Sequence, residues 1–341
     1  MPERSSVAQV TQIGLEATPG TAVAATRRLG SLSLSPSISA EAEMFRPEGL
    51  KFPTVQVLNR EWAEVDVEGT PTYEEVVIPL SGAIDTATVS QVMDGATPTG
   101  AYEWVFEPAS AEADAPKTFT LERGQAGVQA EQFSHLLFTA FGLEVTRTGV
   151  SLSGSGFAKR ATQNHTLTPA LDTPEDLTPI APGHFSVYLG DTPADLDLEV
   201  NRLTRVIGAN PSVEDRYNPA WFVNQAEDSF TTFVENADGV GGTFGLTVEA
   251  DAVGMAWLPR MRVGTTHFVR LEALGPVLYD AGTQTDLRMA FQWDLAVKVE
   301  NAESWSDEDG IYAIPWTLRP VHDATWGKAM SIMVRNTTQA L

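Results

Sequence analysis

The sequence predicts an all-β protein, a sandwich or barrel built from many short strands. Apolar and polar residues alternate in segment after segment, as in Ala63–Val67 (AEVDV), and a period of two is typical of strands that bury one face. Glycine, proline, asparagine and aspartate separate these segments and favour turns. Helical spacing is rare along the chain. Strands packed in layers are therefore expected over a helical or mixed fold.

In the first half, the expected strands are rich in aromatic and β-branched residues. They are Ser31–Ile38, Glu61–Val67, Glu74–Leu80, Tyr102–Phe106, Thr118–Leu121 and the paired segments within Leu143–Leu152. Glu131–Phe141 fits a helix as well as a strand, and a strand is favoured from Leu136 because the alternation continues. Asp85–Met93 is expected to form a short helix, since it begins with a capping aspartate and ends before Asp-Gly.

The second half shows the same rhythm. Its expected strands are Phe185–Leu189, Leu198–Ile207, Phe230–Val234, Thr243–Glu249, His267–Leu271, Met289–Val299, Ile311–Leu318 and Met330–Val334. Ala252–Met261 is expected to be helical. Helices therefore flank the strands and do not dominate either half.

The two halves follow one plan, which suggests two pseudo-repeated copies of a β domain. Each half has a strand, a long polar arm, a strand, a glycine turn, another strand and a short helix, followed by more strands. The offset is roughly 165 to 170 residues, about one domain length. Residues 1–165 would form the first β domain and residues 184–341 the second. Residues 166–183, rich in proline and threonine, would link them. Coincidence is the alternative, because β domains share strand and turn rhythm.

Composition excludes several classes of function. The 341 residues include 45 acidic and 22 basic ones, for a net charge of -23. The sequence has no basic tract that could neutralise the phosphates of DNA. Cysteine is absent, so neither disulfides nor thiolate metal sites can form. No apolar stretch predicts a signal peptide or a membrane span. A soluble chain that does not bind DNA tightly is expected.

Catalytic and cofactor motifs are missing from the sequence. The five histidines form no H-E-x-x-H pair, so a zinc site has no support. There is neither a G-x-S-x-G elbow nor a phosphate-binding glycine loop. No catalytic residue, cofactor or metal is therefore predicted, and the chain is expected not to be an enzyme.

Four segments stand in a fixed order along the chain. The first, Gln12–Leu29, places a glycine, an acidic residue, Gly-Thr and an apolar step before a strand, at Gly14, Glu16, Gly20, Thr21 and Val23. The others are EVDVEGTPTYEEVVIPLSGAI, YEWVFEPASAEADAPKTFTLERG, and DEDGIYAIPWTL followed by MSIMVRNTT. Together they resemble the tail tube proteins, or major tail proteins, of siphovirus-type bacteriophages.

This resemblance implies a tail-tube-type β-sandwich or barrel with one short flanking helix. Subunits of that family join sheet to sheet into rings, and the rings stack into a tube around a tape measure protein, between terminator and tip proteins. Genomic DNA later passes through the tube. No membrane is expected among the partners of the chain. Most members form hexamers from one fold copy per chain. Two copies per chain would give a trimer with pseudo-sixfold symmetry, with a hexamer as the alternative, in a virion assembled in the host cytoplasm.

Two long polar arms are the candidate contacts between subunits or rings. They span Glu41–Leu58 and Gly208–Gln225 and are too long for ordinary hairpin turns. Their apolar side chains are Phe45, Phe52, Tyr217, Trp221 and Phe222, which a solvated loop would not need. The alternative is that the arms fold back on their own core.

The acidic excess gains a role in this interpretation, because a negative lumen would not bind DNA phosphates. The strand acids that could line it are Glu64, Asp66, Glu68, Glu249 and Glu272. Two rival interpretations stay open. One is another virion or surface β-protein, such as a decoration or receptor-binding module. The other is a carbohydrate-active enzyme on a β-sandwich.

Overall fold

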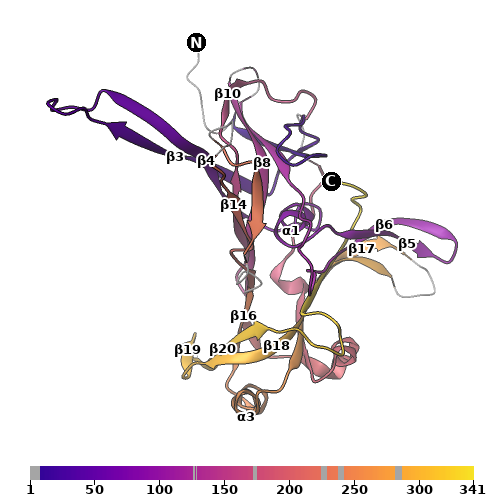
Figure 1. Ribbon diagram of the computed structural model, residues 1–341. Helices are drawn as coiled ribbons and strands as arrows, with labels where there is room; N and C mark the ends of the chain where they lie inside the picture. The colour runs from indigo at the N-terminus through magenta and orange to yellow at the C-terminus, as the bar shows by residue number, and fades with distance from the viewer. Residues whose placement is uncertain are drawn as a thin grey trace.

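A large antiparallel sheet runs through both halves of the chain and is not closed into a barrel. The computed structural model describes residues 8–125, 127, 129–171, 175–223, 229–236, 242–280 and 286–341. Figure 1 shows the sheet descending through the middle of the molecule, with hairpins projecting to either side. The predicted mostly-β fold is confirmed, and closure into a barrel is not observed.

The strands of the first half are β1 (Val10–Leu15), β2 (Arg27–Arg28), β3 (Leu32–Phe45), β4 (Val55–Gly69), β5 (Thr88–Asp94), β6 (Thr97–Phe106), β7 (Phe119–Gly124), β8 (Ala130–Thr146), β9 (Val150–Ala158) and β10 (Thr162–His165). Those of the second half are β11 (Phe185–Gly190), β12 (Arg202–Leu203), β13 (Val206–Val213), β14 (Tyr217–Ala220), β15 (Thr232–Glu235), β16 (Gly242–Glu249), β17 (His267–Tyr279), β18 (Leu287–Ala302), β19 (Ser306–Glu308), β20 (Ile311–Pro320) and β21 (Met330–Asn336). Most predicted strands coincide with observed ones.

Three of the predicted strands and helices are wrong. The observed helices are α1 (Val77–Ala83), α2 (Ala252–Met255) and α3 (Trp257–Val263), with 3-10 turns η2 (Pro182–His184), η3 (Pro193–Asp197) and η4 (Glu199–Asn201). The predicted strand Glu74–Leu80 is wrong, because its first residues form a turn and its last ones belong to α1. The whole run is buried, and burial on all faces suits a helix as well as a strand. The helix predicted at Ala252–Met261 is confirmed.

The other two errors reflect tertiary pairing. Asp85–Met93 was predicted as a helix, yet it enters β5, which pairs with β6 from Thr88 onward. A partner strand therefore overrides the local capping signal. Leu198–Ile207 was predicted as one strand, but it is divided among η4, β12 and the start of β13.

Strand pairing fixes one continuous path through the sheet, in the order β3-β4-β9-β8-β13-β16-β20-β18. The first four strands belong to the first half and the last four to the second. The main hydrophobic cluster draws on both halves, with Val65 and Phe138 from one and Phe244 and Trp293 from the other. The two halves are thus packed as one body.

The proline- and threonine-rich segment between the halves contains no strand in its described residues, 166–171 and 175–183; residues 172–174 lie outside them. Thr168 accepts a hydrogen bond from the Ala25 amide at 3.0 Å, and Pro179 bridges to Thr72. The segment is therefore attached to the first half along its length.

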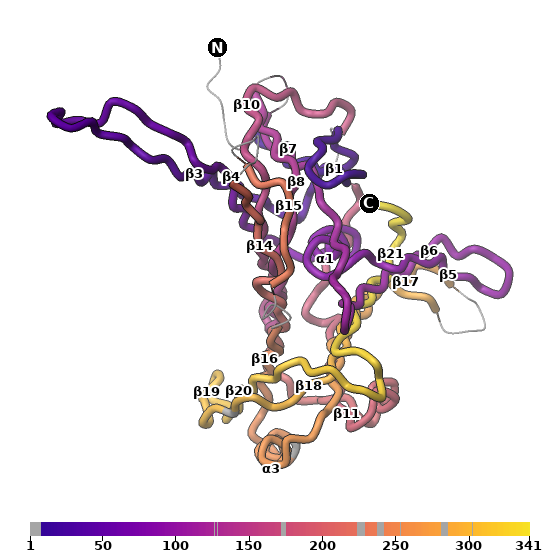
Figure 2. Tube along the Cα trace, in the orientation of Figure 1, coloured from indigo at the N-terminus to yellow at the C-terminus, as the bar shows by residue number. Residues whose placement is uncertain are grey.

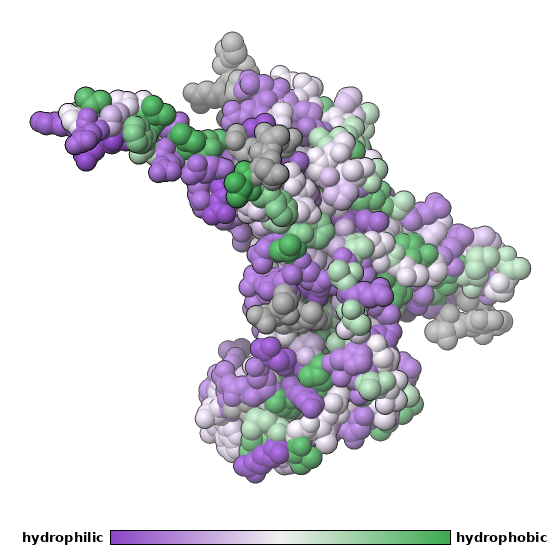
Figure 3. All heavy atoms as spheres, viewed as in Figure 1, coloured by the Kyte–Doolittle hydropathy of each residue, from purple (hydrophilic) through white to green (hydrophobic). Residues whose placement is uncertain are grey.

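The β3–β4 hairpin projects far from the body of the molecule (Figure 2). Its two strands pair with each other from Leu32–Gly69 out to Phe45–Val55. Apolar and polar surface alternates along it in Figure 3, as expected for a two-stranded ribbon exposed on both faces. We call residues 41–60 of this hairpin the arm.

Candidate assembly surfaces

The continuous sheet ends in two strand edges that have no partner strand within the described residues. At one end, β3 pairs with β4 alone. At the other end, β18 pairs with β20 on one side, and its pairing with β17 on the other stops at Val297. We call the unpaired side of β3 the β3 edge, and the unpaired side of β18 beyond Val297 the β18 edge. Open edges present N–H and C=O groups to another chain.

The two halves of the chain are themselves joined through strand edges. β8 of the first half pairs antiparallel with β13 of the second, with Phe141 opposite Val213 and Gly142 opposite Ser212. The pairing skips Pro211, which has no N–H to donate. We call this contact the internal junction.

Strand pairs of the first half recur in the second half. The Gln12–Arg28 pair of β1 and β2 recurs as Val187–Leu203 of β11 and β12, with both residue numbers raised by 175. The pairing of β1 with β7 recurs in β11 with β17, and that of β7 with β8 recurs in β17 with β18. These four strands of each half thus have matching neighbours.

The register of the two halves also agrees in detail. One row across the sheet runs Pro36–Val65–Gly156–Phe138. A second row runs Pro211–Phe244–Leu318–Val299. In both halves the pairing shifts by one residue directly after this row, between Phe138 and Ala140 and between Val299 and Asn301. The rows align β3 with β13 and β8 with β18.

Pro-Ser followed by a branched apolar residue is the sequence signal for this equivalence. It occurs as Pro36-Ser37-Ile38 in β3 and as Pro211-Ser212-Val213 in β13, again 175 residues apart. The tripeptide alone does not predict the equivalence, because three residues carry little weight without the strand register. Val213 is 0% exposed within the internal junction, whereas Ile38 on the β3 edge is 46% exposed.

The arm carries the first two candidate contact residues into solvent. Phe45 is 61% exposed and Phe52 is 77% exposed. Further exposed apolar side chains of the same hairpin are Met44, Leu50, Val55, Val57 and Leu58. Exposed apolar side chains so numerous on one projecting hairpin make the arm a candidate interaction surface.

The second predicted arm, Gly208–Gln225, is not a single loop, because its residues belong in part to β13 and β14. β14 and β15 form a separate hairpin that packs on the first half, and residues 224–228 of the connection lie outside the described ones. Tyr217 is 2% exposed and its hydroxyl donates to the Ile84 carbonyl at 2.8 Å. Trp221 packs edge-on against Trp62 at 5.8 Å between ring centroids. Phe222 remains 56% exposed.

A buried ion pair fixes the second hairpin in place. Arg216, directly before Tyr217, donates to the carboxylate of Asp114, and the two side chains are 0% and 1% exposed. Glu235 of β15 lies 3.6 Å from the same guanidinium. The sequence gives no sign of this pair, because its members are far apart along the chain.

Three of the acidic candidates share one exposed face of β4. Glu64, Asp66 and Glu68 are exposed and alternate with the buried Ala63, Val65 and Val67. Residues directly opposite each other in neighbouring strands lie on the same face of a sheet. This face continues along Glu68–Ser153–Gly142–Ser212–Thr243, across both halves. It is lined by small polar and acidic residues, and we call it the polar face.

The remaining two acidic candidates differ. Glu249 alternates with the buried Val248 and Leu246 in β16, so it also lies on the polar face, paired there with Arg205. Glu272 lies on β17, outside the continuous path. Burial raises its pKa, while the charge of Arg270 opposes this shift. The structure therefore brings four of the five acids onto one face.

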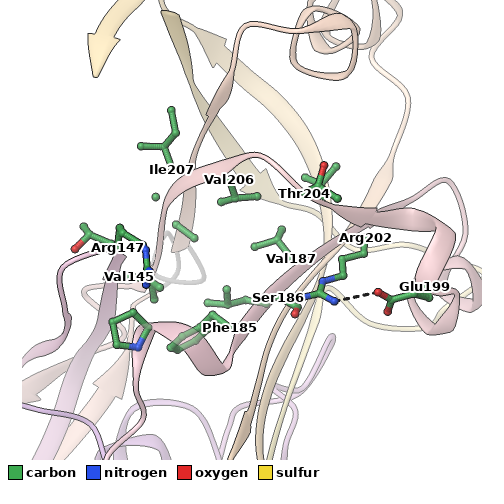
Figure 4. A pocket seen from close by; sticks show the side chains of 16 residues that line it. Val145, Arg147, Phe185, Ser186, Val187, Glu199, Arg202, Thr204, Val206 and Ile207 are labelled. Carbon is green, nitrogen blue, oxygen red and sulfur yellow. Dashed lines mark hydrogen bonds and ion pairs between the residues drawn. The ribbon is translucent and has the colours of Figure 1, made fainter. Parts of the chain in front are cut away.

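A pocket of about 490 Å³ lies beside the internal junction. Figure 4 shows Val145 and Arg147 of the first half facing Phe185 and Val206 of the second. Arg202 at its side forms an ion pair with Glu199 at 3.0 Å. The pocket follows from the meeting of the two halves, and its lining holds no cluster of catalytic groups.

In the part of the chain that the structure describes, no group of three or more histidine, aspartate and glutamate side chains could hold a metal ion. No helix of the described ranges is long and apolar enough to cross a membrane. Comparison with protein-family models found no match, and comparison with curated proteins found none either.

Proposed function

We propose that this chain is a structural subunit of a siphovirus-type phage tail, a tube protein that assembles into stacked rings around a channel for DNA. One observation carries the proposal: an open sheet joins two similar halves edge to edge and ends in two unpaired edges. A head-to-tail contact between such edges closes into a ring when its rotation allows. The ordered segments that resemble tail tube proteins support the same function.

Two pseudo-repeated copies of one β domain per chain are part of this proposal. The recurring strand pairs and the aligned rows support a duplication. If one internal junction stands for one subunit contact, three chains supply six copies of the domain. The proposed ring is therefore a trimer with pseudo-sixfold symmetry, and a ring of six chains is the alternative.

The arm is proposed to bridge neighbouring subunits or rings. Phe45 and Phe52 are exposed on the arm of the β3–β4 hairpin, which projects from the body of the molecule (Figure 1), so burying them requires another molecule. Burial of a phenylalanine side chain contributes about 1.5 to 3 kcal/mol. Phe222 is the exposed candidate of the second arm. Tyr217 and Trp221 support the chain's own fold in the free subunit.

The polar face is proposed to line the channel. Glu64, Asp66, Glu68 and Glu249 would give the lumen a negative potential, which keeps DNA phosphates from binding to the wall. Small residues such as Gly142 and Ser212 would leave the channel open. A tape measure protein and terminator and tip proteins are the proposed partners, in a virion tail assembled in the host cytoplasm.

Negative-stain microscopy of the purified full-length chain at increasing concentration tests this function. We expect rings and stacked tubes with a stain-filled axis. Discrete particles at every concentration would instead fit a decoration or receptor-binding module. Sugar-dependent hydrolysis by such particles would fit a carbohydrate-active enzyme. Either result overturns the tube.

A further inference from the structure

We propose that the β18 edge of one chain pairs with the β3 edge of a second copy in the register of the internal junction, so that Ile38 of one copy faces Ala302 of the next and Ser37 faces Glu303. The inference rests on the proposed function and names its subunit contact residue by residue. The partner is a second copy of this chain.

The register follows from the aligned rows. Pro36 corresponds to Pro211, so Ser37 and Ile38 correspond to Ser212 and Val213. Beyond the shared shift in pairing, Ala140 and Asn301 take the same place, facing Ser155 and Thr317. Phe141 and Gly142 therefore correspond to Ala302 and Glu303.

A backbone hydrogen bond supports the last of these equivalences. Gly142 faces Ser153 in β9, and the Glu303 amide donates to the Pro315 carbonyl in β20 at 3.2 Å. Glu303 thus continues the pairing of β18 with β20 by one residue, as Gly142 does for β8 with β9. The pairs of the internal junction, Val213–Phe141 and Ser212–Gly142, then define the pairs between copies.

Exposure on the two edges fits this contact. Ile38 is 46% exposed where its counterpart Val213 is 0% exposed, so the β3 edge lacks the cover that β8 gives to β13. Near the β18 edge, Trp305 and Tyr312 are 59% and 67% exposed and pack together at 5.8 Å between ring centroids. Apolar side chains at both edges would be buried together by the pairing.

Charge also permits the contact. The sequence from Ser31 to Ala40 carries no charged residue and has serine at every second position around Pro36. Glu303 at the end of the β18 edge therefore meets a hydroxyl group and not a like charge. Pro36 has no N–H to donate, so the pairing between copies would skip it. The internal junction skips Pro211 in the same way.

Cysteine crosslinking tests the register, because the natural chain has no cysteine. Ser37→Cys and Glu303→Cys are placed in one full-length chain and oxidised under assembly conditions. Gly142→Cys with Ser212→Cys is the internal positive control, since a Cβ at Gly142 would lie 3.5 Å from that of Ser212, within disulfide range. Ser35→Cys with Glu303→Cys is the control that is shifted by two residues.

We expect the Ser37/Glu303 chain to give a ladder of covalent multimers on a non-reducing gel. The internal control should stay a crosslinked monomer, and the shifted control should give less than a tenth of the multimers. Mixing two chains with one cysteine each should stop at a dimer that contains both. A ladder that ends at three chains supports the trimeric ring. A ladder that ends at another number of chains overturns the trimer but not the register.

Failure of the register and failure of the function are distinguishable. Suppose that microscopy shows tubes while the Ser37/Glu303 chain gives no multimers and the internal control crosslinks. In that case the proposed register is wrong and the proposed tube function is retained. If the natural chain shows no self-association at any concentration and no pair links two chains, both are wrong. Single-cysteine chains that still form tubes exclude misfolding as the cause.

Discussion

The guanidinium of Arg216 donates to the carboxylate of Asp114 where both side chains are almost completely removed from water. This pair links the loop before β14 to the loop between β6 and β7. It explains why the second hairpin folds onto the first half while the arm projects. The arm has no comparable buried anchor among its described residues, since its Arg60–Glu41 pair is exposed.

Replacing the arginine of this pair should destabilise the fold strongly. Arg216→Met leaves the Asp114 carboxylate buried without its charge partner, which costs about 3 to 5 kcal/mol. Urea unfolding followed by fluorescence measures the change. Arg319→Met, in the exposed pair with Glu300, is the matched control and should cost no more than about 1 kcal/mol. Equal shifts in the two variants would refute the role of the pair as an anchor.

Glu16 should act as a second structural anchor. Its carboxylate accepts hydrogen bonds from the amides of Gly20 and His135 and from the hydroxyls of Thr118 and Thr120, at 2.7 to 2.9 Å. Glu16→Gln keeps the shape but replaces one acceptor with a donor, so we expect a loss of roughly 1 to 3 kcal/mol. Thermal unfolding provides the measurement, and the exposed Glu68→Gln should change nothing beyond about 0.5 kcal/mol.

His135 should make stability depend on pH. Burial lowers the pKa of its imidazole from 6.5 to about 4, and neither ring nitrogen has a hydrogen-bond partner among the described residues. Between these values the unfolded chain binds the additional proton, so stability is lost as the pH falls from about 6.5 to about 4. Relative to His135→Asn, the natural chain should lose up to roughly 3 kcal/mol over this window.

Urea unfolding of both chains at several pH values measures this difference. Asparagine is the chosen replacement because the backbone at this position has a φ of 56°, which asparagine tolerates. Parallel pH profiles for the two chains would show that the histidine does not titrate between folded and unfolded states.

Removing the arm should abolish assembly and leave the fold intact. Ala40 and Glu61 already face each other, so an Asn-Gly turn can replace residues 41–60 and close the hairpin. We expect an unchanged unfolding midpoint and no tubes by microscopy. Phe52→Ser is the milder variant and should raise the concentration needed for assembly, with a change in stability below about 0.5 kcal/mol. Normal tubes from the shortened chain would exclude the arm as a contact.

Reversing the charge of the polar face should create DNA binding. The chain with Glu64→Lys, Asp66→Lys and Glu68→Lys should retain double-stranded DNA, whereas the natural chain should not. Affinity should fall roughly tenfold or more between about 50 mM and about 200 mM salt. A filter-binding assay measures this, with the same three changes to glutamine as the control for lost acidity without gained positive charge. Strong DNA binding by the natural tubes would contradict an acidic lumen.

Alternation in the sequence predicted most of the strands, because one buried face leaves a period of two whatever the partner strand is. It also predicted the exposed acids of β4, whose neighbours Ala63, Val65 and Val67 are buried. Prediction failed at α1, where burial on all sides removes the period, and at β5, where pairing with β6 overrides a helix cap.

The sequence by itself thus determined a mostly-β chain with an excess of acidic residues and predicted a long polar arm at Glu41–Leu58. Only the tertiary structure decided that Tyr217 is buried while Phe52 is exposed, and that Pro36 and Pro211 hold matching places in one sheet. The physical reason is that strand register and side-chain burial depend on contacts between residues far apart in the chain. Local patterns fix the face that a residue occupies, but not the strand or the molecule that covers it.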